Sequence, residues 1–154
     1  ILKKEKIETI SSIKFTPEIS FPKGNYTLIK PNSFDKKDIL CGENALQKSG
    51  KFSFIQGAIC RNNKVISLEG KEGTQQMIKK VKKLTKFPNG ILIKFPKKRQ
   101  DLRVDLPTIG LETLKQCKSA GLKGIVLKHK LNIFLNKSES VKYANKNKMF
   151  ILIK

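Results

Sequence analysis

The chain lacks the residues on which several common kinds of site depend. It has one histidine, His129, and three cysteines, Cys41, Cys60 and Cys117, which lie far apart and form no CxxC pair. A single histidine argues against a zinc site built from a histidine cluster and against nucleophilic triads. An odd number of scattered cysteines argues against a disulfide framework and is typical of a reducing cytosol.

Long apolar runs and nucleotide-binding signatures are missing as well. No apolar run approaches the roughly 18 residues that span a bilayer, and the sequence has no signal peptide. Neither the GxxxxGK[ST] phosphate-binding loop nor the GxGxxG dinucleotide motif is present. The chain begins at Ile1 and not at a methionine, so we expect a piece of a longer polypeptide or a processed one.

Acidic residues are few: 12 stand against 33 lysines and arginines, which gives a net charge of +21. The only arginines are Arg61, Arg99 and Arg103, and lysines are spread over every segment. Because arginine is the usual bidentate reader of phosphates and base edges, this spread is more typical of a general lysine bias than of a nucleic-acid-binding patch. The charge still favours anionic partners such as phosphates, nucleic acids or acidic lipid headgroups.

Hydrophobic periodicity predicts a mixed α/β domain, because strand-like apolar runs alternate with amphipathic segments. We expect strands within 52–60, 64–70, 90–95, 124–127, 131–135 and 149–154, and helices over 33–48, 74–85, 111–120 and from 138 onward. Asn62-Asn63 between the first two strands is a plausible hairpin turn, and Ser33 is the expected cap of the first helix. The sequence therefore predicts a single domain with a central sheet flanked by helices. Residues 1–16 are expected to be a linker or N-terminal arm, and 17–154 the domain.

The stretch QDLRVDLPTIG, residues 100–110, is the strongest candidate for chemistry. From Asp101 to Leu106 the polarity alternates strictly, which predicts an extended segment with Asp101, Arg103 and Asp105 on its polar face. Carboxylates are ligands that Mg²⁺ prefers, and an arginine can hold a phosphate with two hydrogen bonds. A ladder of surface ion pairs would give the same pattern, and the pattern alone slightly favours that explanation.

Two further stretches give weaker signals. Gly73-Thr74 opens a predicted helix, whose free N–H groups and threonine hydroxyl can bind an anion, although plain helix capping is the simpler explanation. Gln56-Gly57 interrupts an apolar strand. A buried glutamine needs hydrogen-bond partners, and a glycine there suggests a close backbone approach. Glu69 and Glu72 stand out as acidic residues in a basic chain.

Taken in order, these stretches resemble a known family. A Gln-Gly in the first hairpin strand is followed by E-x-x-EGT-x-x-M, an apolar strand ending in lysine, QDLRxDLPTIG and AGLxGI. This order is similar to the C-terminal domain of the UDP-2,3-diacylglucosamine pyrophosphatase family of lipid A biosynthesis, from about Pro17 to the end. The stretch QDLRVDLPTIG is the most specific part. Gln75 departs from the aspartate that usually follows EGT, and Ser53 stands where an aspartate is common.

The resemblance implies an α/β hydrolase that depends on Mg²⁺ and cleaves the pyrophosphate of UDP-2,3-diacylglucosamine to UMP and 2,3-diacylglucosamine 1-phosphate. Asp101 and Asp105 would be metal ligands or the water-orienting base, and Arg103 would contact a diphosphate oxygen. The substrate-binding residues would be Gln56, Gly73, Thr74, Gln100 and Thr108. The family's Rossmann-like N-terminal domain is absent from this chain, and we expect activity to need it. The enzyme would work in the cytoplasm. The resemblance leaves open whether it also contacts the inner membrane peripherally and whether it forms a homodimer.

Two other functions fit the sequence. The charge of +21 is compatible with a nucleic-acid-binding module, but nine phenylalanines mostly in strand-like runs, two tyrosines and no tryptophan leave few stacking platforms. We therefore expect no specific nucleic-acid partner. A non-catalytic domain that only assembles with a partner is the other alternative.

Overall fold

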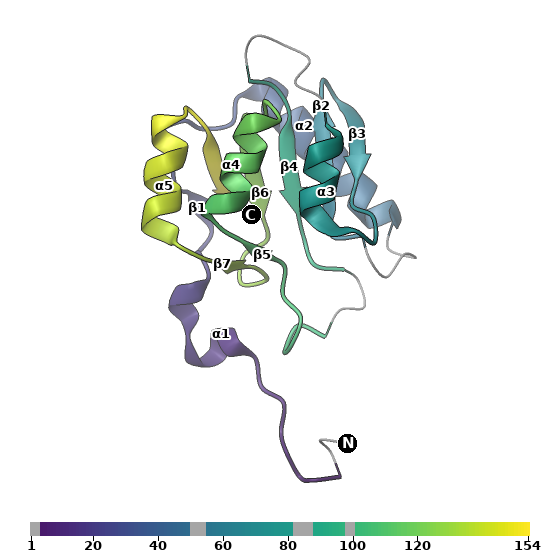
Figure 1. Ribbon diagram of the computed structural model, residues 1–154, viewed down its shortest axis with the longest axis vertical. Coiled ribbons are helices and arrows are strands. Elements are labelled where there is room, and N and C mark those ends of the chain that lie inside the picture. Colours follow the sequence, from purple (N-terminus) through teal and green to yellow (C-terminus); the bar gives the residue numbers. More distant parts are fainter. Residues whose placement is uncertain (1–3, 50–54, 82–87, 98–100) are drawn as a thin grey trace.

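A computed structural model of the chain describes residues 4–49, 55–81, 88–97 and 101–154. Its centre is a six-stranded sheet in the order β1–β8–β6–β4–β2–β3 (Figure 1). The central strands β4, β6 and β8 run parallel to one another, whereas β1, β2 and β3 pair antiparallel with their neighbours. The strands are β1 (Gly24–Asn25), β2 (Gly57–Arg61), β3 (Lys64–Leu68), β4 (Ile91–Lys94), β6 (Gly124–Leu127) and β8 (Phe150–Ile153). The predicted mixed α/β class is confirmed.

Helices cover both faces of the sheet, as Figure 1 shows. Helix α2 (Ser33–Lys48) lies on one face, and α3 (Gly73–Lys80), α4 (Leu111–Ser119) and α5 (Lys137–Lys146) lie on the other. A small parallel pair, β5 (Thr108–Ile109) with β7 (Ile133–Phe134), lies beyond the end of β4. Between residues 4 and 23, the helical elements are α1 (Ser12–Phe15) and the 3₁₀ helix η1 (Pro17–Ile19). Within the described ranges, no helix is long and apolar enough to cross a membrane.

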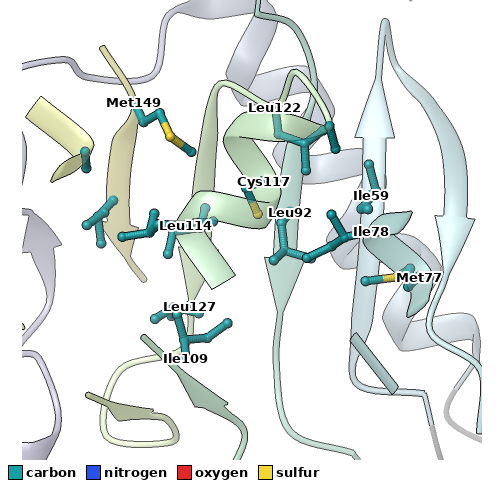
Figure 2. Packing of buried hydrophobic residues seen from close by; sticks show 14 of the residues in the cluster. Ile59, Met77, Ile78, Leu92, Ile109, Leu114, Cys117, Leu122, Leu127 and Met149 are labelled. Carbon is teal, nitrogen blue, oxygen red and sulfur yellow. The ribbon is translucent and has the colours of Figure 1, made fainter. Parts of the chain in front are cut away.

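The core forms on both faces of the sheet, because every residue of β4 and β6 is buried. On the side of α3, α4 and α5, Leu92 packs with Ile78 and Cys117, and Figure 2 shows these side chains between the helices and the strands. On the side of α2, Ile39 packs with Phe150 and further strand residues. The two layers hold the strand ends, where the polar stretches lie, in fixed positions.

Most of the predicted elements are confirmed, with shifted ends. The hairpin turn is confirmed, since Asn62 and Asn63 have φ values of 53° and 58°. The first helix spans 33–48 as predicted, but Asn32 and not Ser33 caps it: its side chain accepts from the Asp35 N–H at 2.9 Å, and the Asp35 carboxylate accepts from the Asn32 N–H at 2.8 Å. Of the expected strand 131–135, only two residues are strand, and they lie outside the central sheet.

Candidate active site

A buried polar cluster lies at the carboxyl end of β4, where ligands bind in open α/β sheets. Lys94, the last residue of β4, is 6% exposed, and Glu69 is 5% exposed. The Lys94 Nζ lies 3.1 Å from Glu69 Oε1 and also donates to the Thr74 hydroxyl. Thr74 Oγ1 in turn donates to Glu69 Oε1 at 2.5 Å. One carboxylate oxygen thus holds both the ammonium and the hydroxyl.

Gly57 makes room for this cluster. The backbone N–H of Glu69 donates to the Gly57 carbonyl at 2.9 Å, which places the glutamate beside β2. A Cβ on Gly57 would lie 2.9 Å from Glu69 Oε2 and 2.9 Å from the Met77 methyl group. The close approach predicted at Gly57 is therefore confirmed, and the group that approaches is the Glu69 carboxylate.

Glycine and threonine at the start of α3 have separate roles. Gly73 has a φ of +83°, a left-handed conformation that favours glycine. The N-cap residue of α3 is Glu72, and it makes no side-chain cap. Thr74 directs its hydroxyl to Glu69 and Lys94. Plain capping therefore does not explain the threonine.

Gln56 is half-buried directly before β2, opposite Phe95, and one atom of its side chain is buried without a partner among the described residues. Its carbonyl accepts from the Phe95 N–H at 2.9 Å, so its backbone continues the pairing of β2 with β4. Its Oε1 atom is buried and has no hydrogen-bond partner among the described residues. Such an oxygen is suited to a donor from a ligand or a water.

Residues 101–106 form a turn, so the predicted extended segment is wrong. The N–H groups of Val104 and Asp105 both donate to the Asp101 carbonyl, at 3.1 and 2.9 Å. Arg103 folds back on Asp101, with Nε 2.9 Å from Oδ1 and Nη2 2.7 Å from Oδ2. These local bonds outweigh the alternating pattern, and Val104, which the pattern placed in the core, is 67% exposed.

The Asp-Arg-Asp residues lie at the surface, and ion pairs account for their contacts. The hydrogen bonds from Arg103 lower the pKa of the Asp101 carboxyl to about 2. Asp105 is exposed, and its Oδ2 lies 3.6 Å from the Lys97 ammonium. The structure thus contains the surface ion pairs that the alternative explanation of the pattern requires. The same exposed charges are also accessible to a diphosphate.

Asn132 links this turn to the buried cluster. Its Nδ2 lies 3.4 Å from the carbonyl of Lys94 and 3.4 Å from that of Pro107, and Asn132 itself is buried. Thr108 follows at the exposed start of β5, with its hydroxyl donating to the Leu106 carbonyl at 3.2 Å. Pro107, at the end of the turn, therefore lies at the same end of the sheet as the buried cluster. Gln100 lies outside the described residues.

Comparison with known proteins shows the family to which the chain belongs. Residues 22–152 match the family described as LpxI C-terminal domain. The chain belongs to the LpxI C-terminal domain family. It is 32% identical, over 130 residues, to the UDP-2,3-diacylglucosamine pyrophosphatase LpxI of Caulobacter vibrioides. That alignment covers 80% of the chain and 46% of the relative, so the chain spans about half the length of that LpxI. The family resemblance of the sequence is confirmed.

The described part of the chain offers few ligands for a metal ion. In the part of the chain that the structure describes, no group of three or more His, Cys, Asp or Glu side chains could hold one. Mg²⁺ needs only one or two carboxylates when substrate phosphates and waters complete its shell. Either exposed aspartate would have to exchange an ion pair for the metal, Asp105 that with Lys97 and Asp101 that with Arg103.

Three residues of the cluster, Glu69, Lys94 and Asn132, were given no role from the sequence. Glu69 stood out only as an acidic residue in a basic chain. Lys94 ends an apolar strand, which is a signal because lysine is rarely buried without a partner. Asn132 gave no signal, since it lies in a short apolar run whose side-chain contacts depend on the tertiary fold. A separate pocket of about 540 Å³ lies at the opposite end of the central sheet. The residues that line it include Asn32, Asn62, Asn89 and Lys123. None of the predicted site residues lines it.

Proposed function

We propose that this chain supplies the diphosphate-cleaving half of a UDP-2,3-diacylglucosamine pyrophosphatase of lipid A biosynthesis. The observation that carries the proposal is the meeting of three separate stretches at the carboxyl end of β4. They are Gln56-Gly57, Glu69 to Thr74 and, through the Asn132 amide, Pro107 at the end of the Asp-Arg-Asp turn. Membership of the LpxI C-terminal domain family supports the same substrate.

The reaction is an attack of water on one phosphorus of the diphosphate. A new P–O bond forms, the bond to the bridging oxygen breaks, and UMP and 2,3-diacylglucosamine 1-phosphate leave. In our assignment Arg103 contacts a diphosphate oxygen and neutralises its charge, while Asp105 or Asp101 accepts the proton of the attacking water. A bound Mg²⁺, held by these carboxylates together with the diphosphate, would supply further charge neutralisation.

Substrate binding falls to the groups around this centre. At the start of α3 the N–H group of Thr74 suits a phosphate oxygen, and Gly73 supplies the left-handed turn that precedes it, with its own N–H donating to the Gly70 carbonyl at 3.1 Å. Gln56 has a buried acceptor for a sugar or base donor, and Gln100 and Thr108 flank the aspartates in sequence. Because the chain spans about half of the matched LpxI, we propose that the other half, the N-terminal domain, completes the cleft.

Two alanine variants test the proposal in the complete enzyme. We expect Asp105→Ala and Asp101→Ala each to lower kcat by about a hundredfold or more, because a group that positions metal or water is lost. Thermal midpoints should change little, since both carboxylates are exposed. Turnover of UDP-2,3-diacylglucosamine and thermal unfolding are measured for both variants.

Glu112→Ala is the matched control. Glu112 on α4 is also an exposed acid in a lysine ion pair, 3.7 Å from Lys115, and it belongs to none of the stretches above. It should leave turnover unchanged. A turn that is only a surface ion-pair ladder predicts near-normal turnover for all three variants, and that outcome would remove the Asp-Arg-Asp residues from the proposed site.

A further inference from the structure

We propose that Lys94 is a catalytic residue that contacts a phosphate oxygen of the diphosphate, and that Glu69 is the positioning residue that holds the Lys94 ammonium for it. The inference rests on the proposed function only for the identity of the anion. The contacts of the buried cluster carry it independently of the Asp-Arg-Asp turn.

The burial of the pair argues against a purely stabilising role. The side chains of Lys94 and Glu69 are 7% and 5% exposed. Removing two charges from water costs several kcal/mol per ion, so a buried ion pair is often no more stable than apolar residues of the same volume. A pair retained at the carboxyl end of a central parallel strand is therefore better explained by a ligand that needs the ammonium.

The bonding inside the cluster is incomplete, and this points to a ligand. A lysine ammonium has three N–H donors, and the described contacts with Glu69 and Thr74 use two of them. Glu69 Oε1 accepts from both partners, whereas Oε2 is buried and has no partner among the described residues. A donor beside an unpaired acceptor suits a phosphate oxygen next to a hydroxyl group or a water.

A second ion pair with a buried carboxylate shows what a satisfied carboxylate looks like, although its Lys123 side chain is 25% exposed. Asp35 is 3% exposed, and the Lys123 ammonium lies 3.0 Å from its Oδ1 and 2.8 Å from its Oδ2. Its Oδ2 also accepts from the Asn32 N–H at 2.8 Å. Both carboxylate oxygens are therefore paired, and the pair lies at the other end of the sheet, away from the proposed site. Lys123 is the matched control for Lys94.

The test measures binding of inorganic pyrophosphate to the 154-residue chain by calorimetry. The main variant is the double substitution Glu69→Gln with Lys94→Met, because Lys94→Met alone leaves an unpaired buried carboxylate and can fail to fold. We expect the double variant to fold, with a thermal midpoint near that of the wild type, and to bind pyrophosphate at least about tenfold more weakly. A lost charged hydrogen bond has that magnitude. The control is the matching double substitution Asp35→Asn with Lys123→Met, since Lys123→Met alone would likewise leave the buried Asp35 carboxylate without its ammonium. It should leave pyrophosphate binding unchanged.

Each result decides the inference. A folded double variant that binds pyrophosphate as tightly as the wild type overturns it, as does a wild-type chain that does not bind pyrophosphate at millimolar concentration. An equal loss in the folded Asp35→Asn, Lys123→Met control also overturns it, because general positive charge then explains the binding. The proposed substrate is judged separately, by turnover of UDP-2,3-diacylglucosamine in the complete enzyme. If that turnover is absent while Lys94 is needed for pyrophosphate, the substrate assignment fails and the role of Lys94 stands.

Discussion

At the scale of single residues, Gly57 shows how an absent side chain shapes the site. The space that a Cβ would take is filled by the Glu69 carboxylate and the Met77 methyl group, each 2.9 Å from that position. Glu69 in turn holds Thr74 and Lys94. Gly57 in β2 therefore leaves the space in which the Glu69 carboxylate lies, and Glu69 directly follows the end of β3.

Gly57→Ala should destabilise the chain and displace Glu69. We expect a loss of about 1–3 kcal/mol in the free energy of unfolding, as for other overpacked sites, measured by urea denaturation. Pyrophosphate binding should weaken in the folded variant, because the carboxylate that holds Lys94 has moved. An alanine variant with unchanged stability and binding would contradict the close packing around Gly57.

The three thiols should differ in reactivity. Cys60 and Cys117 are fully buried, and burial raises the pKa of both thiols, with the neighbouring Cys41 and Asp38 adding to the shift at Cys60. Because the thiolate is the reactive form, a raised pKa leaves less of it at pH 8. We expect iodoacetamide to label the half-buried Cys41 first and the other two only after unfolding, as read by mass spectrometry. Rapid labelling of Cys117 in the folded protein would be inconsistent with the packing of α4.

At the scale of elements, the first long helix depends on a cap that lies one residue before the predicted one. The side chain of Asn32 accepts from the N–H of Asp35, and Asp35 reciprocates. We expect Asn32→Ala to cost about 0.5–2 kcal/mol of stability. Ser33→Ala, at the residue expected from the sequence to cap the helix, should cost almost nothing. Thermal unfolding of the two variants measures the difference, and a larger loss for Ser33→Ala would reverse the assignment.

The sequence was informative where local chemistry decides the structure. Asn62-Asn63 can adopt the left-handed conformations of a tight hairpin, and a continuous apolar run such as Ile91–Lys94 suits a central strand, so both elements were predictable. The turn at 101–106 was not, because the alternation there is overridden by the bonds that Arg103 and the backbone make to Asp101. The role of Asn132 depends on carbonyls from two distant segments, which no local pattern reveals.

At the scale of the whole molecule, the net charge of +21 predicts salt-sensitive attachment to anionic membranes. We expect the chain to bind vesicles that contain phosphatidylglycerol at low salt and to dissociate as the salt concentration rises, because exposed charges are screened within about 10 Å at 0.1 M. Neutral phosphatidylcholine vesicles are the control and should bind little. Sedimentation of vesicles with the chain measures both, and binding that resists high salt would contradict an electrostatic attachment.

The place of β8 in the sheet has a consequence for how the protein is made. Strand β8 is inserted between β1 and β6, although it is the last strand of the fold and β1 is the first (Figure 1). A ribosome delivers the chain from β1 onward, so β2, β3, β4 and β6 can pair while the growing chain still lacks the strand that joins them to β1. During that interval β6 presents an unpaired edge, the kind of edge that invites association with other chains. In the nascent protein the position between β1 and β6 therefore stays unoccupied until Phe150–Ile153 has been synthesised and can pair with both strands.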